Sequence, residues 1–193
     1  QRLINRFGAL PSLLKMRNFL PGTGEMLEIV SSLFENKAQS APPAASVESL
    51  ENFDIVVIGA GPVGILYACW VKQARPETSI LVLEKAGEPG HKIGESTLSG
   101  FCKACRSVGI PQEAMRRLFF LKNGLGFFQA DHHTRDLTEL PEYILETFDE
   151  TYQVERRVLD SLLIARARQL GVQIMQGAEV QLNDSSFQWE NSQ

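Results

Sequence analysis

Three glycines and one glutamate have the types and spacing of a nucleotide-binding site. Gly59, Gly61 and Gly64 follow a short apolar run, and Glu84 comes about 20 residues after the last of them. In such a pattern the first glycine allows a tight turn and the second lets the backbone approach a pyrophosphate. The third lets a helix pack closely against a strand, and a carboxylate after the next strand binds ribose hydroxyl groups. The spacing therefore predicts a dinucleotide site.

The elements that must position these residues follow from the flanking sequence. Residues 54–58 are mostly β-branched and apolar without polar alternation, which predicts a fully buried parallel strand. A helix is expected over 63–74, with its N–H groups and positive dipole end directed at the diphosphate. Residues 79–83 predict a second strand that ends at Glu84. The expected fold class is α/β, a Rossmann-like domain with a ββα-type central parallel sheet.

Glu84 also restricts the choice of dinucleotide. A carboxylate accepts hydrogen bonds from ribose hydroxyl groups and repels a 2′-phosphate, so NADP is disfavoured at this position. NAD and the adenosine half of FAD both remain open on these residues alone.

Composition narrows the class of protein further. The chain has 193 residues and a net charge of -4 without a basic run, so we expect no nucleic-acid partner. No apolar stretch is long enough to predict a transmembrane segment. Three cysteines do not make an even disulfide framework, which favours a reducing, cytoplasmic location. Because the sequence begins with Gln1, we expect a piece of a longer protein or a processed product.

Three regions are expected along the chain. Residues 1–36 are predicted to be helical, and their apolar residues favour a helix packed on the main domain or on an upstream one. A peripheral membrane helix is the alternative, but it has few basic residues. Residues 37–50 are small, polar and proline-containing and indicate a linker. Residues 51–193 are then the dinucleotide-binding domain, in incomplete form.

Further elements are expected within that domain. Gly109 and Gly171 each follow a helical pattern and predict the ends of two helices. The expected helices cover 96–108 and 155–170, and the expected strands cover 124–130, 172–175 and 179–182.

Gly94, Glu95, Ser96 and Thr97 open the first of these predicted helices. A carboxylate in the first turn and a hydroxyl at the start of a helix are typical of capping. The functional alternative is a loop that lies against a cofactor, since this segment follows Glu84 closely.

Cys102 and Cys105 form a CxxC pair, which invites a redox or metal interpretation. Both thiols fall on the apolar face of a predicted helix, which favours buried structural cysteines. A zinc site needs four ligands, whereas Cys69 lies on another helix and the adjacent His132 and His133 point apart on an extended chain. We therefore expect no metal.

Three basic residues complete the candidates. Lys122 precedes a predicted strand, and a lone lysine is usually solvated. Arg156 and Arg157 lie at the start of the helix expected over 155–170, where the helix dipole disfavours a cation. This position indicates that one of them pairs with an anion. The cofactor diphosphate and an acidic side chain are both open, as is a plain surface arginine.

With these residues in place, the chain resembles FAD-dependent monooxygenases of the halogenase-like group, to which geranylgeranyl reductases are similar. Four segments carry the resemblance, and it covers about residues 53–182. They are residues 54–64, residues 81–85 (Leu-Val-Leu-Glu-Lys), residues 92–96 (Lys-Ile-Gly-Glu-Ser) and residues 152–160 (Tyr-Gln-Val-Glu-Arg-Arg-Val-Leu-Asp).

The resemblance implies FAD as cofactor and assigns roles to individual residues. The glycines would hold the diphosphate, Glu84 the adenosine ribose, and Val180 the adenine through its backbone. Lys122 falls where halogenases carry the catalytic lysine that relays hypohalous acid to the substrate. The implied cofactor-binding residues are Gly59, Gly61, Pro62, Val63, Gly64, Glu84, Lys85, Gly94, Glu95, Ser96, Arg156 and Val180.

Departures from the family limit what the chain is expected to do. Leu159 replaces a more usual phenylalanine, a tolerable apolar change. The sequence is expected to be truncated before the substrate-binding region. It lacks the family's Gly-Asp segment and the Trp-x-Trp-x-x-Pro signature, so we expect no catalysis by this chain alone.

The resemblance predicts a halogenase or hydroxylase that uses reduced FAD and oxygen on an organic, aromatic small-molecule substrate, with a separate flavin reductase as candidate electron donor. Three alternatives remain: an FAD-dependent reductase of prenyl groups, a disulfide flavoprotein using Cys102 and Cys105, and a non-catalytic fragment.

Overall fold

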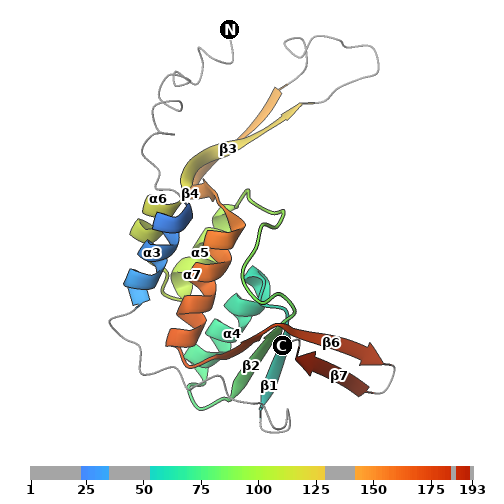
Figure 1. The fold of residues 1–193 in the computed structure, drawn as a ribbon. Helices are drawn as coiled ribbons and strands as arrows, with labels where there is room; N and C mark the ends of the chain where they lie inside the picture. The colour runs from blue at the N-terminus through green and yellow to red at the C-terminus, as the bar shows by residue number, and fades with distance from the viewer. Residues whose placement is uncertain (1–22, 35–52, 129–141, 184–185, 192–193) are drawn as a thin grey trace, which may run out of the picture.

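The computed structural model describes residues 23–34, 53–128, 142–183 and 186–191 (Figure 1). In chain order its elements are α3 (Thr23–Phe34), β1 (Ile55–Ile58), α4 (Pro62–Ala74), β2 (Ile80–Glu84), α5 (Ser99–Ser107), α6 (Gln112–Leu118), β3 (Phe120–Phe128), β4 (Glu142–Gln153), α7 (Arg156–Gln169), β5 (Gln173–Gln176), β6 (Ala178–Asn183) and β7 (Ser186–Asn191). The predicted linker over 37–50 and the two adjacent histidines lie outside the described residues.

A parallel sheet with the order β1-β2-β5 confirms the predicted α/β class. The central strand β2 is buried along its whole length because both of its edges are paired and both of its faces are covered. Ile80 and Val82 face the helices, while Leu81 and Leu83 pack with Ala178 on the other face. Glu84 is the last residue of this strand, so it lies at the carboxyl end of an element held on both edges and both faces.

The prediction that residues 54–58 form a fully buried strand is wrong in its burial. β1 is only partly covered, and the side chain of Ile58 is 55% exposed. Within the described sheet β1 is the edge strand and has a neighbour on one side only, which accounts for the exposure. Its start is fixed by Asp54, whose carboxylate accepts hydrogen bonds from the Ser79 amide (2.8 Å) and hydroxyl (2.7 Å). These bonds hold the pKa of Asp54 below its usual value.

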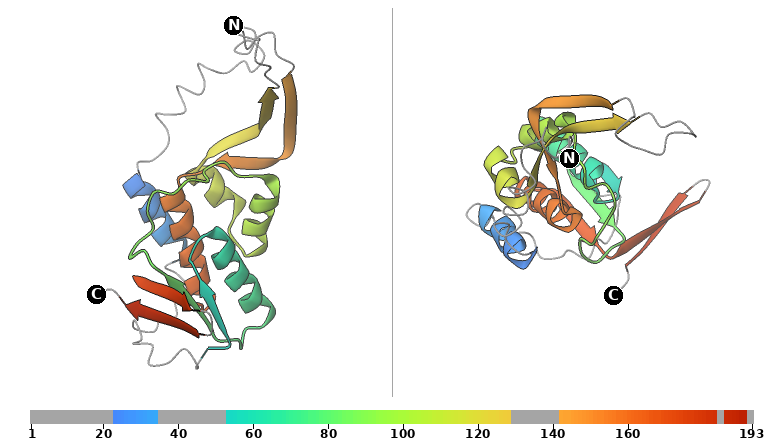
Figure 2. Two further views of the ribbon diagram at one scale, coloured as in Figure 1. Left: turned by 90° about the vertical axis from the view of Figure 1, so that its right-hand side faces the viewer. Right: turned by 90° about the horizontal axis from the view of Figure 1, so that it is seen from above.

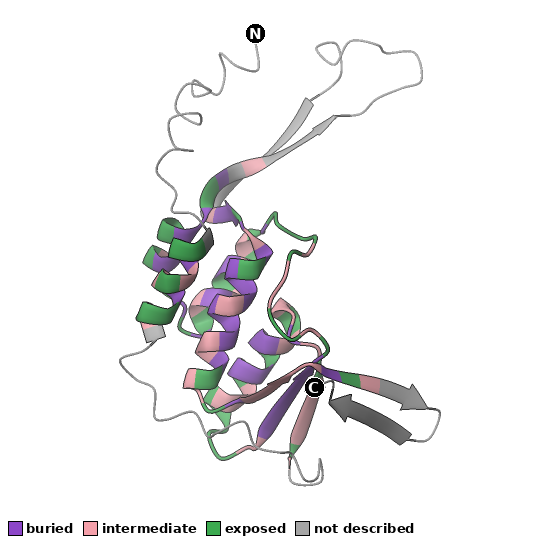
Figure 3. Cartoon of the chain, viewed as in Figure 1, coloured by how far each residue is buried: buried purple, intermediate pink, exposed green. Residues whose placement is uncertain are grey.

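Two helices, α4 and α7, pack against this sheet. α7 packs against both α3 and α4, and its apolar side chains are buried between them (Figures 1 and 3). Met26 and Val30 of α3 belong to the same apolar cluster as Val158 and Leu162 of α7. For the described residues, α3 is therefore a helix packed on the main domain. No helix of the described ranges is long and apolar enough to cross a bilayer.

Two antiparallel strand pairs extend from this core. β3 and β4 form a long ribbon that projects away from the helices, and β6 and β7 form a second pair at the other end (Figures 1 and 2). The pairing of β3 with β4 shifts register between Lys122 and Gly124. The root of the ribbon is tied to α6 by Glu150, which accepts hydrogen bonds from Gln112 (2.7 Å), Tyr152 (2.6 Å) and Arg116. The Arg116 and Tyr152 bonds lower the pKa of Glu150 to about 2.

Several boundaries differ from the sequence prediction. The helix expected over 96–108 begins at Ser99, and the strand expected over 124–130 begins at Phe120. α6, β4 and β7 were not predicted. For the two strands the reason is that their conformation depends on the strands with which they pair. The predicted helices over 63–74 and 155–170 are confirmed to within about two residues. The same holds for the short strands predicted over 172–175 and 179–182.

Candidate functional site

The turn between β1 and α4 has the backbone that the glycine pattern predicted. Gly59 has a φ of +100°, which glycine adopts without the penalty that a side chain brings. Its N–H donates to the Leu83 carbonyl of β2 (2.7 Å). Gly61 is the N-cap of α4 and Pro62 occupies the first helical position, where its missing N–H costs nothing. The turn is therefore anchored to the neighbouring strand and leads directly into the helix.

Gly64 and Gly61 differ in what surrounds them. A Cβ at Gly64 would lie 2.3 Å from the Gly59 carbonyl oxygen and 3.2 Å from Val57 Cγ1. A Cβ at Gly61 would meet nothing within 4 Å. Gly64 thus permits close packing of helix on strand, whereas Gly61 borders open space at the start of the helix.

The N-terminus of α4 is suited to an anion. Its N-cap makes no side-chain capping bond, and its first turn carries no acidic side chain. The N–H groups of a first helical turn have no partner within the helix, and the helix dipole adds positive potential there. Val63 in this turn is 82% exposed, so a ligand can reach it.

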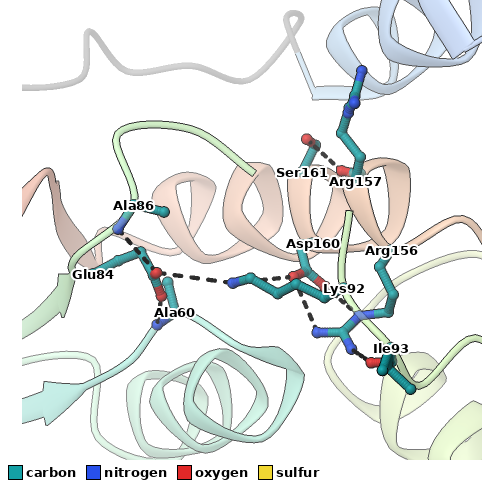
Figure 4. A network of polar contacts seen from close by, with 9 residues as sticks. All are labelled: Ala60, Glu84, Ala86, Lys92, Ile93, Arg156, Arg157, Asp160 and Ser161. Atoms are coloured by element: carbon teal, nitrogen blue, oxygen red, sulfur yellow. Dashed lines mark hydrogen bonds and ion pairs between the residues drawn. The ribbon is translucent and has the colours of Figure 1, made fainter. Parts of the chain in front are cut away.

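Glu84 lies beside this turn rather than in open solvent. Its Oε2 accepts a hydrogen bond from the Ala60 N–H (2.8 Å), and its Oε1 accepts one from the Ala86 N–H (3.1 Å) (Figure 4). The residue is 8% exposed, whereas Lys85 next to it is exposed. The two backbone bonds fix the direction of the carboxylate at the carboxyl ends of β1 and β2.

A small hollow lies next to Glu84. Ala60, Lys92, Asp160 and Gln176 are among the residues that line it. Lys92 Nζ is 3.8 Å from Glu84 Oε1 and 3.8 Å from Asp160 Oδ2, so one ammonium lies between two carboxylates (Figure 4). Lys92 and Asp160 were not predicted as site residues from the sequence. The i, i+4 spacing of Asp160 from Arg156 on a predicted helix was the available signal.

Arg156 pairs with an acidic side chain, which is one of the possibilities that its position at the start of a helix left open. Its Nε and Nη2 donate to the two carboxylate oxygens of Asp160 (3.0 and 3.2 Å). Its Nη1 donates to the Ile93 carbonyl (2.6 Å), and a Cβ at Gly94 would lie 3.1 Å from that nitrogen. Arg157 points away from this network and is exposed (Figure 4). Arg156 therefore joins α7 to the segment that carries Gly94, Glu95 and Ser96.

The capping interpretation of that segment is wrong. α5 begins at Ser99 with Leu98 as N-cap and no side-chain capping bond. Ser96 instead forms a β-bridge with Gln153, and the Val154 N–H donates to the Glu95 carbonyl (2.8 Å). The segment is an added strand-like edge on β4, because it finds its backbone partners there rather than in a helix.

Lys122 is buried, in contrast to the solvated lysine expected from sequence. Its residue exposure is 9%, and its Nζ donates to Ser96 Oγ (3.0 Å) and to the Thr97 carbonyl. Its own carbonyl accepts a hydrogen bond from Thr151 Oγ1 (2.6 Å). The structure thus joins Lys122 to the segment that sequence analysis had proposed as a cofactor loop.

The cysteines are buried and free within the described residues. Burial raises the pKa of Cys69 to about 11 and that of Cys105 to about 12, with the neighbouring Cys102 adding to the latter. Thiolates are the reactive form, so these values oppose a disulfide-exchange role. No cluster of metal-ligating side chains occurs in the part of the chain that the structure describes.

The predicted site residues fall into three groups. The glycine turn and Glu84 meet at the ends of β1 and β2. Arg156, Lys122 and the segment with Gly94 and Ser96 form a second group. Val180 of β6 packs with Leu81 and Leu83 on the face of the sheet opposite the helices.

The fold and the turn define a dinucleotide-binding α/β protein, and comparison with known proteins shows which family it resembles. A sequence model described as tryptophan halogenase matches residues 54–136. The flavin-dependent halogenase malA of Malbranchea aurantiaca is 35% identical over 142 residues, which cover 70% of this chain and 21% of malA. The solved myxobacterial chondrochloren halogenase CndH, described as FAD-dependent, has a TM-score of 0.59 at 28% identity, covering 72% of this chain and 33% of CndH. The chain is therefore similar in sequence and in fold to flavin-dependent halogenases.

One relative has a different activity in its name. Digeranylgeranylglycerophospholipid reductase 1 of Methanopyrus kandleri is 32% identical over 124 residues, which cover 63% of this chain and 29% of the reductase. Across these comparisons the chain spans about a fifth to a third of the relatives' length.

Proposed function

We propose that this chain is the FAD-binding portion of a flavin-dependent oxidoreductase of the halogenase or hydroxylase type. The observation that carries the proposal is the bond from Ala60 N–H to Glu84 Oε2 (2.8 Å), which joins the glycine turn to the carboxylate of the next strand. The similarity to flavin-dependent halogenases adds support. The substrate would be an organic small molecule, with aromatic compounds the first to test.

The residues present fit a bound FAD. Gly61 leaves open space at the unpaired N–H groups of α4, where the diphosphate would bind. Glu84 would accept hydrogen bonds from the adenosine ribose with the lone pairs that its two backbone bonds leave free. The segment with Gly94, Glu95 and Ser96, held by Arg156, would line the flavin side, and Val180 would offer backbone groups to the adenine.

Bound FAD, once reduced, would supply the oxidising chemistry together with oxygen. This chain's residues would bind and orient the cofactor, and Lys122 would act on the substrate side. Its buried ammonium has the restricted direction that such a role requires. A separate flavin reductase is the proposed electron donor, and the three unpaired cysteines accord with the reducing cytoplasm. The proposed boundaries remain 1–36, 37–50 and 51–193.

A thermal-shift titration tests the proposal. A ligand that binds only the folded state raises the midpoint of unfolding as its concentration grows. We expect FAD to raise it, and NADP to leave it unchanged because Glu84 repels a 2′-phosphate. A rise of the midpoint with NAD alone would contradict the proposal. So would an unchanged midpoint with both NAD and FAD.

A pair of variants ties the shift to the proposed site. Gly61→Ala adds a methyl group that meets no protein atom within 4 Å but would point at the diphosphate. The variant should fold with stability within about 1 kcal/mol of the wild type, the usual range for a change of N-cap, and lose the FAD shift. Gly100→Ala, where a Cβ also meets nothing within 4 Å, is the matched control and should keep the shift.

The match to the Methanopyrus kandleri reductase favours a second candidate, an FAD-dependent reductase of prenyl double bonds. The two candidates differ in their need for Lys122. In a longer polypeptide that contains this chain, Lys122→Ala should abolish halogenation and leave prenyl reduction largely intact. Buried placement of the ammonium supports the halogenase candidate.

A further inference from the structure

Lys122 is held by hydrogen bonds to the segment that precedes α5. Its Nζ has two described acceptors, the Ser96 hydroxyl at 3.0 Å and the Thr97 carbonyl. No carboxylate pairs with this ammonium among the side chains that the structure describes. The N–H groups of a buried ammonium need hydrogen-bond acceptors, and these two oxygens are the acceptors that the described residues supply.

The residue that supplies the second acceptor, Thr97, is itself held by β4. The Thr97 N–H donates to the Tyr152 carbonyl (3.0 Å), and the Thr97 hydroxyl donates to the same carbonyl (2.8 Å) while accepting from the Tyr152 N–H (2.8 Å). On the other side of the segment, Arg156 binds the Ile93 carbonyl (2.6 Å). β4 and α7 therefore fix the position from which the segment reaches Lys122.

Of the two acceptors, only the Ser96 hydroxyl belongs to a side chain. A lysine side chain has four rotatable bonds and carries a point charge, so one acceptor alone leaves its direction weakly defined. Two acceptors on adjacent residues restrict the ammonium to one direction. Ser96 is exposed apart from this bond, so its side chain has no packing role.

We propose that Ser96 is a positioning residue for Lys122, a role that extends the proposed function, in which Lys122 is the residue that acts on substrate. The Ser96 hydroxyl holds the ammonium against the Gly94–Thr97 segment, residues 94–97. Since the same segment is the proposed flavin-side loop, the lysine and the cofactor loop are positioned together.

Site-resolved acetylation of lysines tests this without any enzyme assay. The chain is treated with an acetylating reagent, and the rate at each lysine is measured by mass spectrometry. Ser96→Ala should raise the rate at Lys122 about fivefold, since a hydrogen bond to a charged group is lost while the Thr97 carbonyl remains. The exposed Lys85 should keep its rate and serves as the internal reference.

Two further variants separate positioning from a general loss of structure. Ser96→Thr keeps the hydroxyl, suits an extended backbone, and should restore slow acetylation at Lys122. Ser161→Ala removes a hydroxyl that bonds only to the Arg157 carbonyl (2.8 Å) of its own helix and should change nothing.

The outcomes are decisive in either direction. An unchanged Lys122 rate in Ser96→Ala, or a rate in Ser96→Thr as fast as in Ser96→Ala, would overturn the inference. A faster rate at every lysine would also overturn it, because that indicates unfolding. The thermal shift with FAD is scored separately, so failure of FAD binding and failure of the Ser96 contact cannot be confused.

Discussion

Replacing Gly64 by alanine tests whether close packing of helix on strand builds the dinucleotide turn. The new Cβ would lie 2.3 Å from the Gly59 carbonyl oxygen and 3.2 Å from Val57 Cγ1. The oxygen belongs to backbone that is itself bonded to β2 through the Gly59 N–H (2.7 Å). Neither the Gly59 carbonyl nor β1 can shift locally. The start of α4 must therefore move away from β1 by about 1 Å to restore an ordinary contact.

The expected cost follows from two opposing effects. Overpacking of this kind costs about 1–3 kcal/mol. Alanine is favoured over glycine inside a helix by about 1 kcal/mol, which offsets part of it. Because the contact is with backbone that cannot shift locally, the cost should lie in the upper part of that range, and we expect a net loss of about 1–2 kcal/mol in the free energy of unfolding. For a chain of this size that lowers the thermal midpoint by about 2–8 °C.

Thermal and urea unfolding of the purified chain measure this effect. Gly61→Ala is the matched control within the same turn, since its Cβ meets nothing within 4 Å. Gly100→Ala, in the exposed part of α5, reports the helix-propensity gain without a clash. If Gly64→Ala proves as stable as Gly61→Ala, the close contact does not constrain the turn and the reasoning is refuted.

Two further predictions concern the ribbon root and the cysteines. The pKa of Glu150 is lowered from an ordinary 4.5 to about 2, so its interaction with Arg116 stabilises the fold above pH 4.5 and is lost as the pH falls toward 2. Glu150→Gln should therefore flatten the loss of stability between pH 4.5 and 2, measured by urea unfolding; an unchanged pH profile would contradict the network. Cys105, whose pKa burial raises to about 12, should resist a disulfide reagent at pH 8 until denaturant unfolds the chain. Rapid reaction of the folded protein would show that its thiol is accessible.

The glycine turn could be predicted from sequence because its requirements are local. A positive φ at Gly59, a missing side chain at Gly64 and a strand before them follow from residue types within one short segment. Glu84 followed as well, since it ends the next strand of the same unit. The strands β1, β2 and β5 and the helices α4 and α7 were equally within reach of hydrophobic patterning, although the order of the strands was not.

Contacts between distant segments could not be predicted in this way. Ser96 was interpreted as a helix cap because its local sequence favours one. Its backbone instead pairs with Gln153 of β4, more than fifty residues away, and its hydroxyl accepts a hydrogen bond from Lys122 of β3. β4 itself was missed because its conformation depends on pairing with β3.

Sequence alone therefore determined the dinucleotide-binding unit and, through its motifs, the family that the chain resembles. Tertiary structure decided which candidates meet. A lysine that looked like ordinary surface is buried against Ser96 and Thr97, and Arg156 bonds to Asp160 and to the Ile93 carbonyl. The physical reason is that burial and hydrogen-bond partners belong to the packed arrangement of β3, β4 and α7, whereas backbone conformation at a glycine turn belongs to the residues themselves.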